Sequence, residues 1–143
     1  MAVIAVAPAT AASLTSPERA LLQQMNSTRA AHGLGPMAVD WKLQSAARAH
    51  AADMLRRDYF SHGPFLSRIL SYGPKGPMFG ENLAWGAGAS ARPAAIVRSW
   101  LASPGHRAVL LRPGFRRVGV AAPTGNFRGV ANARVVAADF AGV

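Results

Sequence analysis

The sequence of 143 residues contains no cysteine, and only six of its residues are aspartate or glutamate. The absence of cysteine excludes disulfide bonds, thiolate catalysis and zinc sites built from cysteine ligands. With Glu18 and Glu81 as its only glutamates, the chain has few carboxylates for acid–base chemistry. No apolar stretch approaches the roughly 18 residues that a membrane-spanning helix needs, so we expect no membrane span.

Basic residues dominate the charged set. Sixteen lysines and arginines, fourteen of them arginine, give a formal net charge of +10 at pH 7. Such a surface attracts polyanions such as nucleic acid, anionic lipid or anionic cell-envelope polymers. The arginines are scattered, however, and no basic run is interleaved with aromatic residues as in nucleic-acid modules. We expect no specific nucleic-acid partner, and a simple solvated basic surface remains an alternative to any polyanion function.

The length fits one domain, and a hydrophobic fraction of 50% is enough for an unaided core. The first dozen residues are small and apolar, and Ala9-Thr10-Ala11 has the small-x-small pattern of a signal-peptide cleavage site. A charged leading region is missing, so we interpret residues 1–13 either as a signal-peptide remnant or as a flexible N-terminus. The signal interpretation predicts a secreted, extracellular or periplasmic protein whose folded domain covers residues 14–143.

Helical patterns occupy most of the chain before residue 113. Thr15 or Ser16 can cap a first helix that stops at Gly33, and Asp40 can cap a second helix that runs to about Asp58. We expect further helices over residues 66–70 and 90–101, and a short one that starts at 103 and ends before 113.

Strand-like patterns come late. A loop over residues 73–80, rich in proline and glycine, precedes a brief extended segment over 82–85. Residues 117–122 and 134–140 read as strands, with a turn over 124–126. Helices first and strands late predict an α+β domain with an antiparallel sheet.

A set of short motifs follows in order along the chain: Met25-Asn26-Ser27-Thr28-Arg29, Ala47 to Met54, Tyr59-Phe60-Ser61-His62, Gly80-Glu81-Asn82-Leu83-Ala84, Trp100 to Arg107, Val118-Gly119-Val120 and Ala138-Asp139-Phe140-Ala141. This ordered set resembles the bacterial, cysteine-free branch of the CAP superfamily, which includes the cysteine-rich secretory, antigen 5 and plant pathogenesis-related proteins. The resemblance covers roughly residues 18 to 142, and implies an α-β-α sandwich with a central antiparallel sheet.

The resemblance also implies a central cleft that carries two histidines and two glutamates and binds a divalent metal in many members. Three of these four positions match, as His62, Glu81 and His106. The second glutamate has no clear counterpart, and Ser103 stands at the nearest equivalent position. The expected metal ligands are therefore His62 and His106, with zinc as the candidate cofactor. Glu81 would either orient one imidazole or act on a bound water.

Each of these residues also has an ordinary structural interpretation. His62 can serve as a helix-end cation, Glu81 as a salt-bridge partner and His106 as a surface residue. Ser103 is expected to cap the short helix by accepting the backbone N–H of His106, since nothing around it resembles a nucleophile elbow. Asn82 is expected to hold the loop through backbone hydrogen bonds.

Three functions fit these observations. The first is a secreted, monomeric binding module whose cleft takes a metal, a small ligand, a lipid or a peptide without turnover. The second is a metal-assisted, peptidase-like hydrolase that uses Glu81 as its base. The third is a polycationic binder of anionic envelopes or nucleic acid, whose binding would weaken steeply with salt. We favour the first.

Overall fold

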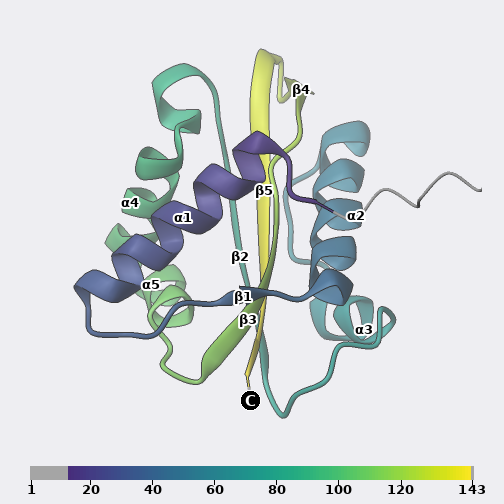
Figure 1. Ribbon diagram of the computed structural model, residues 1–143. Coiled ribbons are helices and arrows are strands. Elements are labelled where there is room, and N and C mark those ends of the chain that lie inside the picture. Colours follow the sequence, from purple (N-terminus) through teal and green to yellow (C-terminus); the bar gives the residue numbers. More distant parts are fainter. Residues whose placement is uncertain (1–12, 143) are drawn as a thin grey trace, which may run out of the picture.

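Helices cover both faces of a five-stranded sheet in the computed structural model, which describes residues 13–142 (Figure 1). One face carries α1 (Ser16–Ala31), α4 (Pro93–Ala102) and α5 (Pro104–Leu110), and the other carries α2 (Trp41–Arg57) and α3 (Phe65–Leu70). This arrangement confirms the predicted α-β-α sandwich. Of the predicted signal-peptide remnant, residues 1–12 lie outside the described residues.

The sheet has the strand order β1-β3-β5-β2, and β4 pairs with β5 off this path. All pairs are antiparallel except β1 with β3, and β2 lies at an edge of the sheet. The strands are β1 (Ala38–Val39), β2 (Phe79–Gly86), β3 (Phe115–Ala121), β4 (Thr124–Phe127) and β5 (Val130–Gly142).

The strands extend beyond the predicted bounds, and two of these differences show how pairing between distant segments decides them. β2 begins inside the predicted loop, since Phe79 and Gly80 pair with Ala141 and Phe140 of β5. The predicted turn over residues 124–126 is instead part of β4, which pairs with β5. Neither pairing leaves a signal in the local sequence.

The helix ends follow the predicted capping residues. Thr15 and Glu18 form a capping box at the start of α1, and Gly33, with φ of 72°, follows its last turn. Asp40 accepts hydrogen bonds from two backbone N–H groups in the first turn of α2. The expected helix over 90–101 is instead a 3-10 turn, η1 (Gly88–Ala91), followed by α4, because Pro93 starts a new helix as its first residue.

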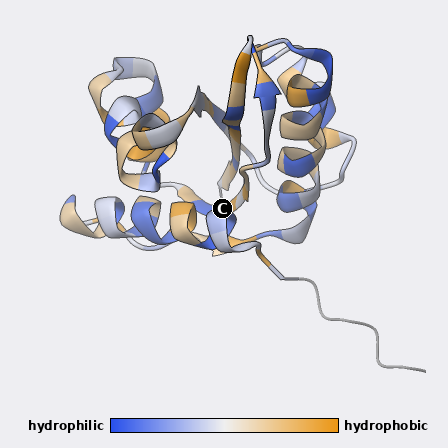
Figure 2. Cartoon of the chain, turned by 90° about the horizontal axis from the view of Figure 1, so that it is seen from above, coloured by the Kyte–Doolittle hydropathy of each residue, from blue (hydrophilic) through white to orange (hydrophobic). Residues whose placement is uncertain are grey.

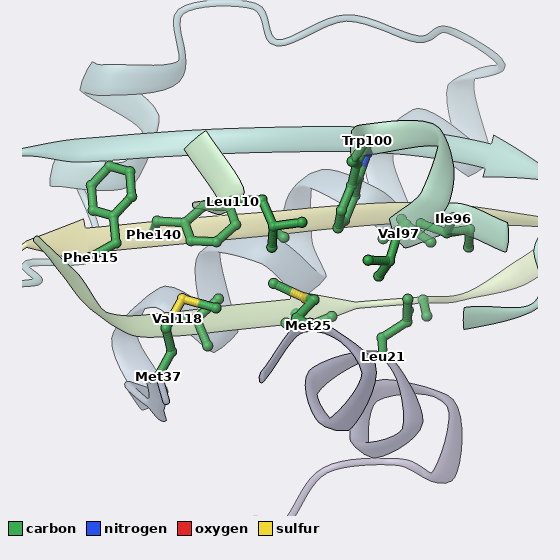
Figure 3. Close-up of a cluster of buried hydrophobic side chains, with 14 residues drawn as sticks. Leu21, Met25, Met37, Ile96, Val97, Trp100, Leu110, Phe115, Val118 and Phe140 are labelled. Atoms are coloured by element: carbon green, nitrogen blue, oxygen red, sulfur yellow. The ribbon is translucent and has the colours of Figure 1, made fainter. Parts of the chain in front are cut away.

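The main core lies between the sheet and the layer of α1, α4 and α5 (Figure 3). Trp100 is buried there and donates its indole N–H to Leu83 O at 2.9 Å. Phe115 and Phe140 stack with ring centroids 5.5 Å apart. Figure 2 shows the sheet between the two helical layers, so apolar side chains on both of its faces are covered.

A buried arginine joins four segments on this side. Arg29 of α1 donates to the carbonyl oxygens of Gly35, Leu110, Arg112 and Phe115 at 2.8–3.0 Å. These hydrogen bonds satisfy the buried guanidinium without a carboxylate and hold the end of α5 against the start of β3.

On the opposite face, α2 lies directly on the sheet at Gly119. A Cβ there would be 2.2 Å from the backbone carbon of Leu43 and 2.3 Å from Gln44 N. The Gln44 amide pairs with both backbone groups of Val120, at 2.6 and 2.8 Å. Gly119 pairs with Asp139 of β5, and Asp139 pairs with Glu81 of β2. Residues paired in this way lie on the same face of the sheet, so all three face the layer of α2 and α3.

Candidate functional site

The edge strand β2 places consecutive side chains in opposite layers, because side chains alternate along a strand. Glu81 belongs to the row that faces α2 and α3, and Arg68 of α3 contacts it. Asn82 points the other way and donates to His106 O in α5 at 2.9 Å, so it joins the strand to a helix. The edge of the sheet is thus where both helical layers meet.

A cleft of about 320 Å³ opens at this edge. The structure brings all five predicted site residues to its wall, namely His62, Glu81, Asn82, Ser103 and His106. His62 arrives from the loop after α2, whereas Ser103 and His106 come from the junction of α4 with α5. Residues from well-separated parts of the chain therefore line one cavity.

Glu81 fixes the ring of His62. The His62 Nδ1 lies 2.7 Å from Glu81 Oε1, and the imidazole is 52% exposed while the carboxylate is almost fully buried. A carboxylate only accepts hydrogen bonds, so Nδ1 carries the proton. In the neutral ring the other nitrogen, Nε2, is then free to bind a ligand.

The second oxygen of Glu81 is also engaged. Arg68 Nη2 donates to Glu81 Oε2 at 2.7 Å and to His62 O at 3.1 Å. Burial raises the pKa of Glu81, but hydrogen bonds from Asp139, Arg68 and His62 outweigh burial and leave this pKa below its usual value. Glu81 is therefore ionised near neutral pH, with both oxygens occupied.

Asp139 lies beside Glu81 on β5 and is completely buried. Its nearest cation, Arg68 Nη1, is 3.8 Å away, and neither carboxyl oxygen has a partner when the group is ionised. Burial, followed by the hydrogen bond and negative charge of Glu81, raises the pKa of Asp139 well above its ordinary value. This raised pKa favours the protonated form of Asp139, in which its carboxyl group can share a proton with the neighbouring Glu81.

Ser103 corrects one prediction. It stands at the N-cap position of α5 but makes no capping hydrogen bond to a backbone N–H. Its hydroxyl instead lies 2.8 Å from His106 Nδ1, because the imidazole three residues ahead folds back over the helix start. Burial, reinforced by the positive charge of His62, lowers the pKa of His106, so this imidazole is neutral near pH 7.

The donor set at the cleft is limited to two imidazoles. Over residues 13–142, no three histidine or carboxylate side chains are grouped so that they could hold a metal ion. Glu81 is poorly placed to act as a ligand, because its carboxylate is almost fully buried and is already held by His62 and Arg68. A zinc ion would fit only with His62 and His106 as protein ligands and water in the remaining positions.

Sequence reasoning missed two residues of this site. Arg68 of α3 provides positive charge beside the buried carboxylates, and Asp139 lies next to Glu81 with a raised pKa. A sequence signal for Asp139 exists, since an aspartate within a valine- and alanine-rich strand is rarely buried without a partner. Arg68 leaves no such signal, because it is one arginine among fourteen.

Comparisons with known proteins agree with this architecture. The structure matches an outer surface protein of Borrelia burgdorferi with a TM-score of 0.75 at 20% identity, covering 90% of this chain and 94% of that one. It also matches an extracellular protein containing a SCP domain from Bacillus anthracis, with a TM-score of 0.70 at 27% identity, covering 93% and 45%.

Two curated relatives come from Bacillus subtilis. The protein YkwD is 33% identical over 113 residues, and the membrane protein YlbC is 33% identical over 111 residues. These alignments take up 76% and 74% of this chain but only 43% and 31% of the relatives, so the chain spans less than half of their length. Within residues 13–142, none of the helices is both long and apolar enough to traverse a bilayer.

The model of the cysteine-rich secretory protein (CAP) family matches residues 22–137, which include every residue of the cleft. The motifs, the sandwich and this match agree, and the chain belongs to the CAP family.

Proposed function

We propose that this chain is an extracellular binding domain whose cleft holds a small ligand or a divalent metal ion between His62 and His106, without turnover. The extracellular location is supported by the family's secretory character and by the extracellular Bacillus anthracis protein with the same fold. The relatives extend well beyond the matched region, so the domain is expected to act together with further segments in such proteins.

The hydrogen bonds and the lowered pKa of Glu81 are the reason for proposing binding rather than hydrolysis. A general base needs contact with water and a pKa close to the working pH. The Glu81 carboxylate is instead almost fully buried, is held by hydrogen bonds from His62 and Arg68, and has a lowered pKa. These contacts suit a group that orients His62 rather than one that removes a proton from water.

The same contacts leave two imidazoles for a ligand. His62 has its Nε2 free, and His106 is neutral near pH 7 because burial lowers its pKa. Neutral imidazole is a good zinc ligand. Arg68 and the net charge of +10 oppose a cation, so we expect zinc to bind weakly.

Zinc titration by calorimetry tests the cleft. The wild type should give weak, saturable heat, and His106→Ala should lose at least about tenfold in affinity because one of two protein ligands is gone. His32→Ala is the matched control, since His32 is exposed at the end of α1 and does not line the cleft. Identical flat traces for the wild type and His106→Ala would end the metal part of the proposal.

A peptide-library digest addresses turnover. We expect neither the wild type nor Glu81→Gln to cleave peptides, with or without zinc. Cleavage by the wild type that disappears in Glu81→Gln would instead support the hydrolase, since that substitution keeps the shape of the side chain and removes its charge.

A further inference from the structure

A second cavity, of about 570 Å³, adjoins the cleft, and His62 lines both. Its walls come from the last turns of α2, from the loop over residues 59–64 and from Arg68 of α3. Its volume lies in the range of about 300–1,000 Å³ that is typical of small-molecule sites. Glu81, Ser103 and His106 line only the cleft, so the second cavity has its own chemistry.

Positive charge predominates around this second cavity. Arg56, Arg57 and Arg68 line it, whereas Asp53 is the only acidic residue among residues 13–142 that does so. Asp53 accepts from Arg56 at 2.8 Å, from Arg57 at 3.2 Å and from the Tyr59 hydroxyl at 2.6 Å. One carboxylate therefore serves two guanidinium groups, and the wall has a surplus of positive charge.

The two guanidinium groups also have donors to spare. Each guanidinium carries several N–H groups in a fixed planar fork, and Arg56 and Arg57 each use one in the bond to Asp53. Both side chains are mostly exposed, at 73% and 67%. A carboxylate or phosphate can therefore be bound by these forks without displacing Asp53.

The rest of the wall suits the organic part of a ligand. Ala49, Ala52 and Pro64 contribute apolar surface, and the Tyr59 ring is held in place by its hydrogen bond to Asp53. His50 is buried, and its Nε2 donates to Ser61 O at 2.8 Å because a carbonyl only accepts. The cavity thus combines basic side chains with patches of apolar wall.

We propose that this second cavity is a binding site for a small organic anion, whose carboxylate or phosphate is held by Arg56 and Arg57 and whose apolar body lies against Tyr59 and the alanines of α2. The site goes beyond the proposed function of the cleft and does not depend on metal binding there. It selects by charge and by apolar contact.

Amide and guanidinium NMR of the 15N-labelled chain tests this proposal at constant ionic strength set by chloride. Inorganic phosphate probes the charge, and phenyl phosphate probes the apolar wall. Both should give saturable shifts in the last turns of α2 and in residues 59–64, and phenyl phosphate should bind several-fold more tightly. Shifts that do not saturate, or that spread evenly over the basic surface, would overturn the proposal.

Charge-matched variants separate the site from general attraction. Arg56→Gln/Arg57→Gln should weaken phenyl phosphate binding at least tenfold, whereas Arg98→Gln/Arg107→Gln should change it less than twofold. Both doubles remove the same charge, and the latter two arginines are exposed on α4 and α5 and do not line the cavity. Equal losses in the two doubles would refute a local site.

A third variant should act in the opposite direction. Asp53→Asn removes the competing carboxylate and should tighten phenyl phosphate binding severalfold, and unchanged or weaker binding would contradict the proposal. His106→Ala should leave anion binding unaltered, so failure of the zinc site and failure of the anion site are distinguishable.

Discussion

At the residue scale, the buried pair of Glu81 and Asp139 has a consequence for pH. Burial and the neighbouring carboxylate raise the pKa of Asp139 above its unfolded value of 3.8. The folded chain therefore binds a proton that the unfolded chain releases, and this group makes stability fall as pH rises above 3.8. Below pH 3.8 the folded and unfolded chains both hold this proton, so the group no longer makes stability depend on pH.

Asp139→Asn should remove this dependence. The amide mimics the protonated acid, donates to Glu81 and never ionises. We expect the stability of the variant relative to the wild type to increase as pH rises from about 4 toward the raised pKa of Asp139, with a slope of at most about 1.4 kcal/mol per pH unit. Urea unfolding across that range measures it.

Asp58→Asn is the control for loss of an exposed carboxylate, because Asp58 lies at the solvent-facing end of α2. Parallel pH curves for wild type and Asp139→Asn would show that Asp139 is ionised in the folded chain. The carbon-13 shift of the Asp139 carboxyl group gives a second, direct reading.

The sequence predicts the residues of the cleft better than the contacts among them. His62, Glu81 and His106 stand in short motifs that the family resemblance identifies. The roles of Arg68 and Asp139 follow from strand register and from the placement of α3, which no local motif encodes. Ser103 is a further example: its position at the start of α5 predicts a capping bond to the backbone, but its hydroxyl bonds to the His106 side chain instead.

At the element scale, the close approach of α2 to β3 depends on one glycine. A methyl group at Gly119 would meet the α2 backbone at 2.2 Å, and backbone cannot rotate away as a side chain can. We expect Gly119→Ala to lower the free energy of unfolding by about 3 kcal/mol, as measured by urea denaturation.

Gly105→Ala in α5 is the matched control, since nothing lies within 4 Å of its added Cβ. It should leave stability unchanged or raise it by about 1 kcal/mol. A similarly small effect at Gly119 would mean that α2 can move off the sheet at little cost.

Helices and strands differ in how far sequence predicts them. Capping residues set the starts of α1 and α2, because the groups they satisfy lie within a few residues. β1 has two residues and β4 has four, so both depend on partner strands rather than on their own pattern. The fold class still emerges correctly, since it needs only the order of helices and strands.

At the scale of the whole molecule, the net charge of +10 acts independently of either cavity. We expect a sulfated polymer such as dextran sulfate to bind at low salt and to be released as sodium chloride rises, with a steep linear decrease of log affinity against log salt. Fluorescence polarisation with a labelled polymer measures the slope.

The two arginine double variants also test polymer binding, and here we expect them to behave alike. Arg56→Gln/Arg57→Gln and Arg98→Gln/Arg107→Gln should weaken polymer binding by similar factors, because the long-range attraction counts charges rather than positions. Polymer binding that ignored salt, or that depended on one pair alone, would contradict a delocalised attraction.

The position of the cleft at the edge strand has a mechanical consequence. His62 follows α2 and His106 lies in α5, two helices from opposite layers of the sandwich. Among the strands of residues 13–142, β2 pairs only with β5. A ligand that bound both rings would link the two outer layers at an edge of the sheet. Occupancy would then add its own binding free energy to the cohesion of the fold.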